Sequence, residues 1–429
     1  MGRYQIPSTL NSILRAFRYR NYRLFFIGQG LSLIGTWMTQ MAMAWLVYRI
    51  TRSVLMLGVI GFSSQIATFL LAPVGGVLAD RWNPHRILVV TQILAMIQSL
   101  ALAGLALTGV ITVWEVVGLS VAQGLVNAFD IPARQSFVVD LVEEKKDLSN
   151  AIALNSSMFN GARLLGPPIA GAVIAIGGEG LCFLIDAISY LAVIGTLLAM
   201  RALPKPVEAK KAPILREVVQ GIQYAASVVP IRVLLLFVAF LSFAGMSYGV
   251  LMPAFAKETL HGNPNVFGWL MGSTGFGALC GSIYLASRKS VRGLVRLTVW
   301  SAFIFGIGLM AFAFARVLWV SLALLFVIGF GMIVQMAASN TILQTIVDDD
   351  KRGRVMSLFM MAFMGMTPWG SLAVGGLAHW IGISNTFLLS GASCVIGAAV
   401  LASQLPRLRA MIRPIYVRMG IIKSSLGYN

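Results

Sequence analysis

The sequence predicts an all-α integral membrane protein in which twelve transmembrane helices form two pseudo-symmetric six-helix bundles. Of its 429 residues, 58% are hydrophobic and only 11% are charged, whereas soluble globular proteins carry roughly 25% charged residues. Twelve apolar segments are long enough to cross a bilayer as helices, which takes about 20 residues each. Lys and Arg gather between alternate segments, as the positive-inside bias of membrane proteins requires.

The first half of the chain begins with a polar segment and continues with six apolar ones. Residues 1–23 form an N-terminal segment that we expect in the cytoplasm. No small-residue cleavage site follows the first apolar run, so that run is a membrane span rather than a removed signal. We expect one N-terminal six-helix bundle over residues 24–200, with spans at 24–48, 54–79, 87–110, 113–139, 151–176 and 180–200.

A linker separates this bundle from a second one. Residues 201–230 contain prolines and lysines that interrupt the apolar pattern. Apolar residues at 214, 215, 218, 219 and 222 then repeat at helical spacing, which predicts an amphipathic helix on the cytoplasmic surface of the membrane. The second bundle is expected over residues 231–403 and a basic cytoplasmic tail over 404–429, with spans at 231–256, 265–287, 294–314, 317–346, 354–380 and 382–403.

The net charge is +18, and the positions of the basic residues along the chain indicate which side of the membrane each loop faces. With twelve spans, both termini lie on one side of the membrane. Of the 33 Lys and Arg residues, 28 fall on that side, four fall on the other and Arg163 lies within a span. This bias orients the termini and the linker toward the cytoplasm. The excess charge also attracts anionic membrane lipid, and it does not indicate a nucleic-acid partner.

The sequence lacks the constellations that mark an enzyme, a metal site or an ATP-driven pump. The cysteines Cys182, Cys280 and Cys394 lie far apart within apolar runs, and the histidines are equally scattered. The sequence shows no nucleophile–base pairing and no glycine-rich phosphate loop. We therefore expect no catalytic residue, no metal and no cofactor.

The turn between the second and third spans carries a motif. It places Gly76, Asp80, Arg81 and Arg86 between two uncharged helices. A charge at the bilayer centre costs about 2.5 kcal/mol or more, so this turn belongs at the membrane surface. The motif resembles the loop signature of the major facilitator superfamily, with Arg86 one position late and without the usual glycine after the acid. An ordinary charged cytoplasmic loop is the alternative.

Other segments agree with that resemblance. The two halves of the chain echo each other, with residues 183–189 aligning with residues 387–393. Two six-helix repeats joined by a linker are the architecture of the major facilitator fold. Several segments also resemble the bacterial exporters related to the enterobactin exporter: Pro132–Gln135, Asn150–Ala151, Ala162–Pro167, Asp186–Ser189 and Arg352–Ser357.

The resemblance implies a function and a location. It implies a monomeric, multi-pass transporter of the bacterial cytoplasmic (inner) membrane that exports a bulky amphipathic small molecule, such as a siderophore or a drug, by proton-coupled alternating access. An importer, or a flippase for lysophospholipid or other lipid on the same fold, is the alternative. A membrane-embedded enzyme or a channel fits less well, because the sequence has neither a catalytic constellation nor a repeated filter.

Charges inside the spans are the candidates for proton coupling, because buried charges in membranes are costly and mark ion pathways. Asp130 and Arg134 lie four residues apart and so share a helical face. Arg163 lies in the fifth span and Asp186 in the sixth. We expect Asp130, paired with Arg134 or Arg163 in one conformation only, to exchange the coupling proton, with Asp186 as the second candidate. A static ion pair that holds the bundle together is the alternative.

The same resemblance suggests a gate at the cytoplasmic side. Asp80, at the end of the second span, would accept hydrogen bonds from the first amides of span eleven, which begins near Val355. Such orphan amides at a helix N-terminus attract a carboxylate. Asp140, at the end of span four, would pair with Arg81 or Arg86 when this side is closed.

Polar residues of spans one, four, seven and ten are the candidates for solute binding, since these spans line the central path in this superfamily. Flexible methionines of the second half, such as Met332 and Met361, can adapt to varied shapes, and facing lipid is their alternative role. Hydrogen bonding between helices is the alternative role for the polar residues. The candidates are Gln29, Trp37, Gln40, Gln123, Asn127, Ser242, Met246, Tyr248, Gln335, Asn340 and Gln344.

Overall fold

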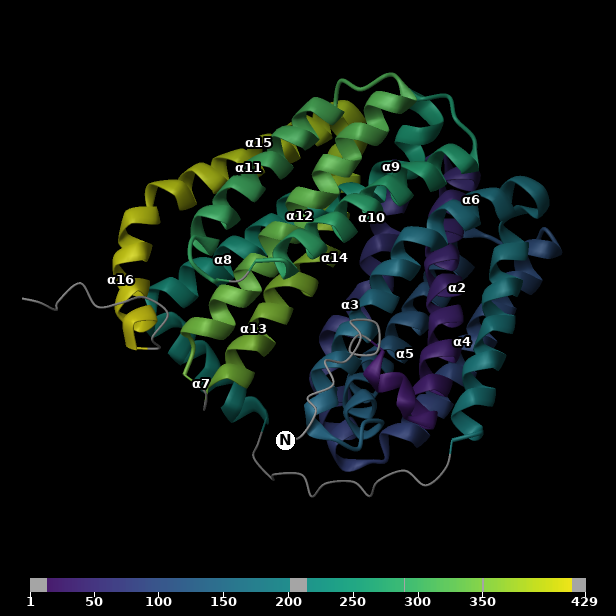
Figure 1. Cartoon of the computed structure of the whole chain (residues 1–429). Coiled ribbons are helices and arrows are strands. Elements are labelled where there is room, and N and C mark those ends of the chain that lie inside the picture. The colour runs from purple at the N-terminus through teal and green to yellow at the C-terminus, as the bar shows by residue number, and fades with distance from the viewer. Residues whose placement is uncertain (1–13, 201–213, 289, 349–350, 419–429) are drawn as a thin grey trace, which may run out of the picture. The chain divides into compact units, whose positions relative to one another are not determined.

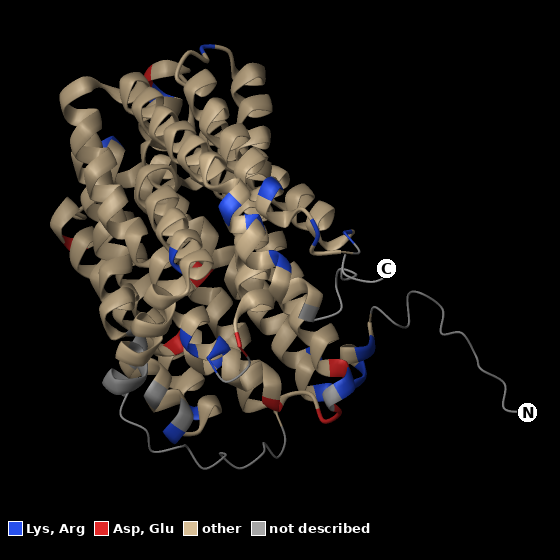
Figure 2. Ribbon diagram, turned by 90° about the vertical axis from the view of Figure 1, so that its left-hand side faces the viewer, with Lys and Arg blue, Asp and Glu red and all other residues tan. Residues whose placement is uncertain are grey.

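The computed structural model describes residues 14–200, 214–288, 290–348 and 351–418, and these ranges contain helices and connecting turns but no strand (Figure 1). Ten helical segments in this part of the chain are long and apolar enough to cross a membrane. Figure 2 shows charged residues mainly near helix ends and in loops, with long uncharged stretches between them. The predicted fold class, an all-helical multi-span membrane protein, is confirmed.

The helices of the first half occupy the six spans predicted there. A short 3-10 turn, η1 (Arg15–Arg18), precedes them. The helices are α2 (Arg20–Thr51), α3 (Val54–Arg81), α4 (Pro84–Leu107), α5 (Val113–Asp140) and α6 (Lys145–Leu198). Helix α6 covers two predicted spans, which meet at a kink at Gly178. The φ angle of Gly178 is +74°, a value that glycine adopts without a Cβ clash. Helix α2 occupies the first predicted span, although it is not among the ten segments counted above.

The second half contains more helical pieces than predicted spans. They are α7 (Ile214–Ser227), α8 (Val229–Ala244), η2 (Met246–Leu251), α9 (Met252–Ala254), η3 (Phe255–Thr259), α10 (Pro264–Ala286), α11 (Leu294–Phe312), α12 (Leu318–Ile346), α13 (Arg352–Met364), α14 (Met366–Ile381), α15 (Ile383–Ser403) and α16 (Leu405–Arg418). Two spans predicted as single helices are interrupted, the seventh at Gly245 and the eleventh at Gly365. Glycine is a poor helix former, and a hydropathy pattern does not reveal such local breaks.

The linker and the tail both contain amphipathic helices. A helix, α7, forms in the segment where the linker helix is predicted. It exposes Val219 and Ile222, and its Tyr224 hydroxyl donates to Oδ2 of Asp348 at 3.0 Å. Its location on the cytoplasmic surface stays a prediction. Residues 201–213 of the predicted linker lie outside the described residues. The tail, predicted only to be basic, forms α16 and buries Leu408, Ile412 and Tyr416, because these residues recur every four positions on one helical face.

The chain divides into two compact units. Unit 1 comprises residues 1–50 and 66–210, and unit 2 comprises residues 51–65 and 211–429. The first half of α3 therefore groups with unit 2, although the sequence predicts the whole helix in the bundle over 24–200. The predicted domain boundaries at 24–200, 201–230 and 231–403 stay predictions.

The two units use different means of packing. In unit 1, α4 packs against both α5 and α6, with polar side chains between them. In unit 2, α10 packs along α12, and α11 packs against α12 and α15. Glycines allow α10 and α12 to approach closely: a Cβ added to Gly329 would lie 2.1 Å from the carbonyl oxygen of Thr274. Small residues at such crossings let membrane helices gain van der Waals contact.

Candidate functional site

The first feature of the site is a fully bonded carboxylate on α5. Asp130 is 2% exposed. Its Oδ1 accepts hydrogen bonds from the Thr91 hydroxyl at 2.9 Å and the Gln92 amide at 2.8 Å, both on α4. Its Oδ2 pairs with Arg134, one turn further along α5. The four-residue spacing that predicted a shared face thus produces an ion pair, and hydrogen bonds from α4 hold the carboxylate in place.

The second feature is a buried carboxylate without a countercharge. Asp186 on α6 is 1% exposed. Its Oδ2 accepts hydrogen bonds from the hydroxyls of Thr39 on α2, at 2.8 Å, and Ser99 on α4, at 2.9 Å. Its Oδ1 is buried and has no hydrogen-bond partner among the described residues. No described Lys or Arg pairs with Asp186, and the salt bridges of unit 1 engage Asp130, Glu144, Asp147 and Glu179 instead.

A glycine makes room for this carboxylate. A Cβ added to Gly35 of α2 would lie 2.5 Å from Oδ1 of Asp186 and 3.1 Å from its Cα. Side chains do not tolerate such short contacts, so α2 and α6 reach this separation only because residue 35 is glycine. The close approach also brings the Thr39 hydroxyl, one turn later on α2, within bonding distance of Asp186.

A small polar cavity lies beside Asp130 within unit 1. It has a volume of about 40 Å³, and a water molecule needs roughly 10–15 Å³ on this measure, so it can hold a few waters. Three buried polar atoms of its lining residues have no partner among the described residues: Oε1 of Gln92, Oε1 of Gln123 and Nε of Arg134. Ordered water is the usual partner of such atoms. The lining also includes Gln29, Thr36, Asn127, Asp130 and Tyr190.

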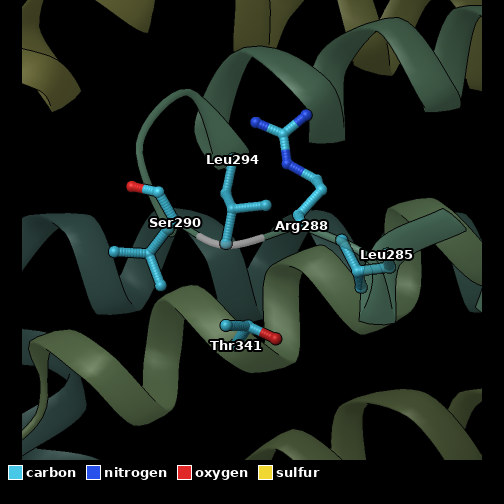
Figure 3. Close-up of a pocket in the computed structure, with 6 residues that line it drawn as sticks. Leu285, Arg288, Ser290, Leu294 and Thr341 are labelled. Atoms are coloured by element: carbon cyan, nitrogen blue, oxygen red, sulfur yellow. The ribbon is translucent and has the colours of Figure 1, made fainter.

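A second cavity, in unit 2, has a different character. It has a volume of about 150 Å³ and lies between the end of α10, the start of α11 and Thr341 of α12 (Figure 3). Its charged lining residue, Arg288, is exposed. The guanidinium donates to the backbone oxygen of Arg292 at 3.0 Å and the Tyr284 hydroxyl at 3.3 Å. This cavity lies at helix ends, away from the polar residues predicted to bind solute.

The structure brings some of the predicted solute-binding residues together and leaves others apart. Gln29, Gln123 and Asn127 line the cavity in unit 1. Trp37 lies instead beneath Arg163, whose guanidinium carbon is 5.8 Å from the ring centroid. Gln40 is exposed and does not line the cavity. The sequence predicts Arg134 or Arg163 as the partner of Asp130, and in this structure Asp130 pairs with Arg134.

Most of the predicted residues of unit 2 bond to a residue four positions away in the chain. Gln335 donates to Ser339 at 3.2 Å, and Gln344 donates to Asn340 at 2.7 Å, both one turn apart on α12. Ser242 donates to the sulfur of Met246 at 3.6 Å, and Tyr248 packs edge-on against Phe305. Bonds between neighbouring turns of one helix do not by themselves form a solute site, so the role of these residues stays a prediction.

The loop motif is described in part. Helix α3 ends at Arg81, and Asn83 caps α4 by accepting a hydrogen bond from the amide of His85 at 2.9 Å. Arg81 and Arg86 are exposed, and neither pairs with Asp140 among the described residues. Gly76 has nothing within 4 Å of an added Cβ, so packing does not require glycine there. The Asp80 side chain lies outside the described residues, and the gate stays a prediction.

Sequence reasoning missed several residues of unit 1. Thr39, Thr91, Gln92 and Ser99 supply the hydrogen bonds to the two carboxylates, but isolated hydroxyl and amide residues in apolar spans give little signal. Glu179 lies between the predicted spans 151–176 and 180–200. It is buried, and its two carboxylate oxygens accept hydrogen bonds from Arg49 at 2.8 and 3.1 Å. Its position directly after Gly178 in an apolar stretch was the available clue.

The chain is similar to known membrane transporters over nearly its whole length. The sequence profile of the family described as "Transmembrane secretion effector" matches residues 11–415. The chain is 26% identical over 389 residues to the staphyloferrin A transporter of Staphylococcus aureus, covering 87% of this chain and 93% of that protein. It is 26% identical over 395 residues to the multidrug efflux pump Tap of Mycolicibacterium fortuitum, covering 88% and 93%. It is 23% identical over 407 residues to the macrolide efflux protein A of Streptococcus pyogenes, covering 92% and 99%.

Solved structures share the fold. A bacterial homologue of the human lysosomal transporter Spinster, in an inward-facing and unoccupied conformation, matches with a TM-score of 0.65 at 14% identity, covering 95% of this chain and 99% of that one. The nucleoside transporter NupG matches with a TM-score of 0.70 at 13% identity, covering 92% and 99%. At these identities the likeness is one of fold.

Proposed function

Because the chain belongs to the transmembrane secretion effector family of the major facilitator superfamily, it is a multi-pass membrane transporter and not an enzyme, and we propose that it is a proton-coupled exporter. Three relatives are named as a siderophore transporter, a multidrug efflux pump and a macrolide efflux protein. Siderophores and macrolides are bulky molecules that combine polar and apolar surface. We assign a solute of this class to the present chain.

The observation that carries proton coupling is the contrast between the two buried carboxylates. Asp130 is held by an arginine, a threonine and a glutamine, which together stabilise the anion. Asp186 has two hydroxyl donors on one oxygen and none on the other. An isolated buried anion is costly, so a proton on Asp186 stabilises the conformation described here. The coupling role therefore moves from Asp130, the first choice from sequence, to Asp186.

The surface chemistry of unit 2 supports the solute class. The four buried Asp and Glu residues among the described residues all lie in unit 1. Unit 2 instead exposes flexible apolar side chains, including Met360, Met361 and Met364 on α13. Methionine adapts to irregular apolar shapes. A solute with one polar and one apolar side could use both kinds of surface during transport.

The charge bias of the sequence supports an orientation in the membrane. We place both termini in the cytoplasm of a bacterial cell, with the protein acting as a monomer in the inner membrane. The basic loops and tail would then face the anionic cytoplasmic leaflet. Protease added at the outside of intact cells should leave a cleavage site engineered near Lys210 uncut.

Transport in proteoliposomes tests the function. Vesicles whose outer face presents the termini would be given an acidic lumen and supplied with staphyloferrin A or erythromycin as probes. A proton-coupled exporter accumulates a suitable probe in the lumen and stops when an ionophore collapses the pH gradient. Accumulation that ignores the gradient would contradict proton coupling. Movement of labelled lysophospholipid between leaflets, without accumulation of either probe, would favour the flippase alternative.

A further inference from the structure

Two of the polar contacts between helices α2 and α6 are spaced one turn apart. In the first contact, the Thr39 hydroxyl donates to Asp186 at 2.8 Å. In the second, Thr36 Oγ1 lies 3.5 Å from the Tyr190 hydroxyl. Thr36 and Thr39 are three residues apart on α2, and Asp186 and Tyr190 are four apart on α6, so each pair shares a helical face with Cβ atoms about 5–6 Å apart.

Only one of these two contacts lies at the polar cavity of unit 1. Asp186 does not line the polar cavity, whereas Thr36 and Tyr190 both line it. Gln92, Gln123 and Arg134 line the same cavity, and each has one buried polar atom without a partner among the described residues, for which ordered water is the usual partner. Tyr190 is 4% exposed, so its hydroxyl reaches the cavity from within the protein. Tyr190 thus lines the cavity and follows the carboxylate by one turn of α6.

We infer that Tyr190 relays a proton between the waters of this cavity and Asp186. The inference rests on the proposed proton coupling and adds the route. In the structure the phenol lies beside Thr36 and Oδ1 of Asp186 has no partner among the described residues, so the phenol turns toward Oδ1 to hand over its proton. A protonated water in the cavity gives its extra proton to the phenol oxygen and becomes neutral water, while the phenol proton passes to Oδ1 of Asp186. One O–H bond forms at the phenol oxygen as another breaks, so the tyrosine is neutral before and after, and the carboxylate becomes a neutral acid.

The surroundings of this route contain few other titratable groups. Cys182 lies one turn before Asp186 on α6, and Asp130 and Arg134 face the cavity within electrostatic range of Tyr190. Helix α2 contributes hydroxyls and glycine at this level, and α4 contributes Ser99. Because Asp130 is already paired with Arg134, Asp186 is the acceptor left for a proton that reaches Tyr190.

Infrared difference spectroscopy of the full chain in phosphatidylcholine vesicles tests this without a solute. A rapid drop in pH should produce the carbonyl absorption of a newly protonated carboxylic acid, and Asp186→Asn should remove that absorption. Tyr190→Phe, which deletes only the hydroxyl, should leave the final amplitude intact but slow its appearance at least tenfold. Thr36→Val should slow it less, because Thr36 only positions the phenol.

A control variant distinguishes the relay from a general effect of losing a buried hydroxyl. Tyr22→Phe removes another buried hydroxyl, which donates to the backbone oxygen of Ala151 and does not line the cavity, so it should leave the rate unchanged. An unchanged rate in Tyr190→Phe, or equal slowing in Tyr22→Phe, would overturn the relay. A carboxylic acid absorption that persists in Asp186→Asn would instead overturn the assignment of the coupling proton.

Discussion

Units 1 and 2 contain similar numbers of long helices but hold them together in different ways. Unit 1 buries Asp130, Asp147, Glu179 and Asp186, and three of these four have a basic partner. The described part of unit 2 buries no charged side chain and relies on glycine-mediated contacts such as those between α10 and α12. The difference supports the proposal that the coupling proton is exchanged in unit 1, where Asp186 is the one buried carboxylate of the described residues without a basic partner.

The largest expected effect on stability comes from breaking the ion pair on α5. Asp130→Asn leaves the Arg134 side chain, which is 20% exposed, beside a neutral amide, and removing one partner of a buried pair costs about 3 kcal/mol. Asp186→Asn should cost much less, because an amide oxygen still accepts from Thr39 and Ser99. Thermal unfolding of both variants in detergent compares them directly. Equal losses of stability would mean that the two carboxylates are not held differently.

A glycine substitution tests the close packing of helices in unit 2. Gly329→Ala places a methyl group 2.1 Å from the Thr274 carbonyl oxygen, and overpacking of this kind costs about 1–3 kcal/mol. Gly376→Ala on α14 is the matched control, because an added Cβ there meets nothing within 4 Å. We expect a lower melting temperature only in the first variant. A similar melting temperature for both variants would show that α10 and α12 can move apart at little cost.

A smaller loss is expected at the Arg49–Glu179 pair. Glu179 is buried, but the Arg49 side chain is 59% exposed, so solvent screens the pair. Glu179→Gln should cost about 1 kcal/mol, within the range for a partly screened hydrogen bond to a charged group. A double-mutant cycle with Arg49→Gln isolates the interaction. A coupling energy near zero would place this pair with ordinary surface ion pairs.

The smallest effect concerns Glu144, in the loop before α6. The hydrogen bond from Lys146, and then the charge of Arg18, hold the pKa of Glu144 below its ordinary value of 4.5. A lowered folded-state pKa means that the stabilisation is present above the ordinary value and is lost as pH falls through the folded value. The melting temperature of Glu144→Gln should therefore approach that of the wild type at low pH. A difference that stays constant down to low pH would exclude this contribution.

Much of the fold follows from sequence pattern, because a membrane span must be apolar for its whole length. Helices occupy all twelve predicted segments of the chain. The breaks at Gly245 and Gly365 and the kink at Gly178 did not follow from this pattern. These are local backbone events that leave the mean hydropathy almost unchanged.

The candidate site was predictable only where its residues share a helix. The Asp130–Arg134 pair follows from i,i+4 spacing. The bonds from Thr39 and Ser99 to Asp186 instead depend on the packing of α2 and α4 against α6. Sequence spacing says nothing of that packing, which is why Asp130 ranked above Asp186. Gly35 fixes the approach of α2, but as one glycine among the 43 in the chain it gave no distinct signal.

The most direct measurement of the central claim compares two transport modes of Asp186→Asn in one vesicle preparation. With a probe that the wild type accumulates, uptake driven by an imposed pH gradient is measured beside exchange of labelled for unlabelled probe without a gradient. If Asp186 exchanges the coupling proton, the variant loses gradient-driven accumulation and retains exchange. A variant that still concentrates the probe in response to the pH gradient would contradict the account.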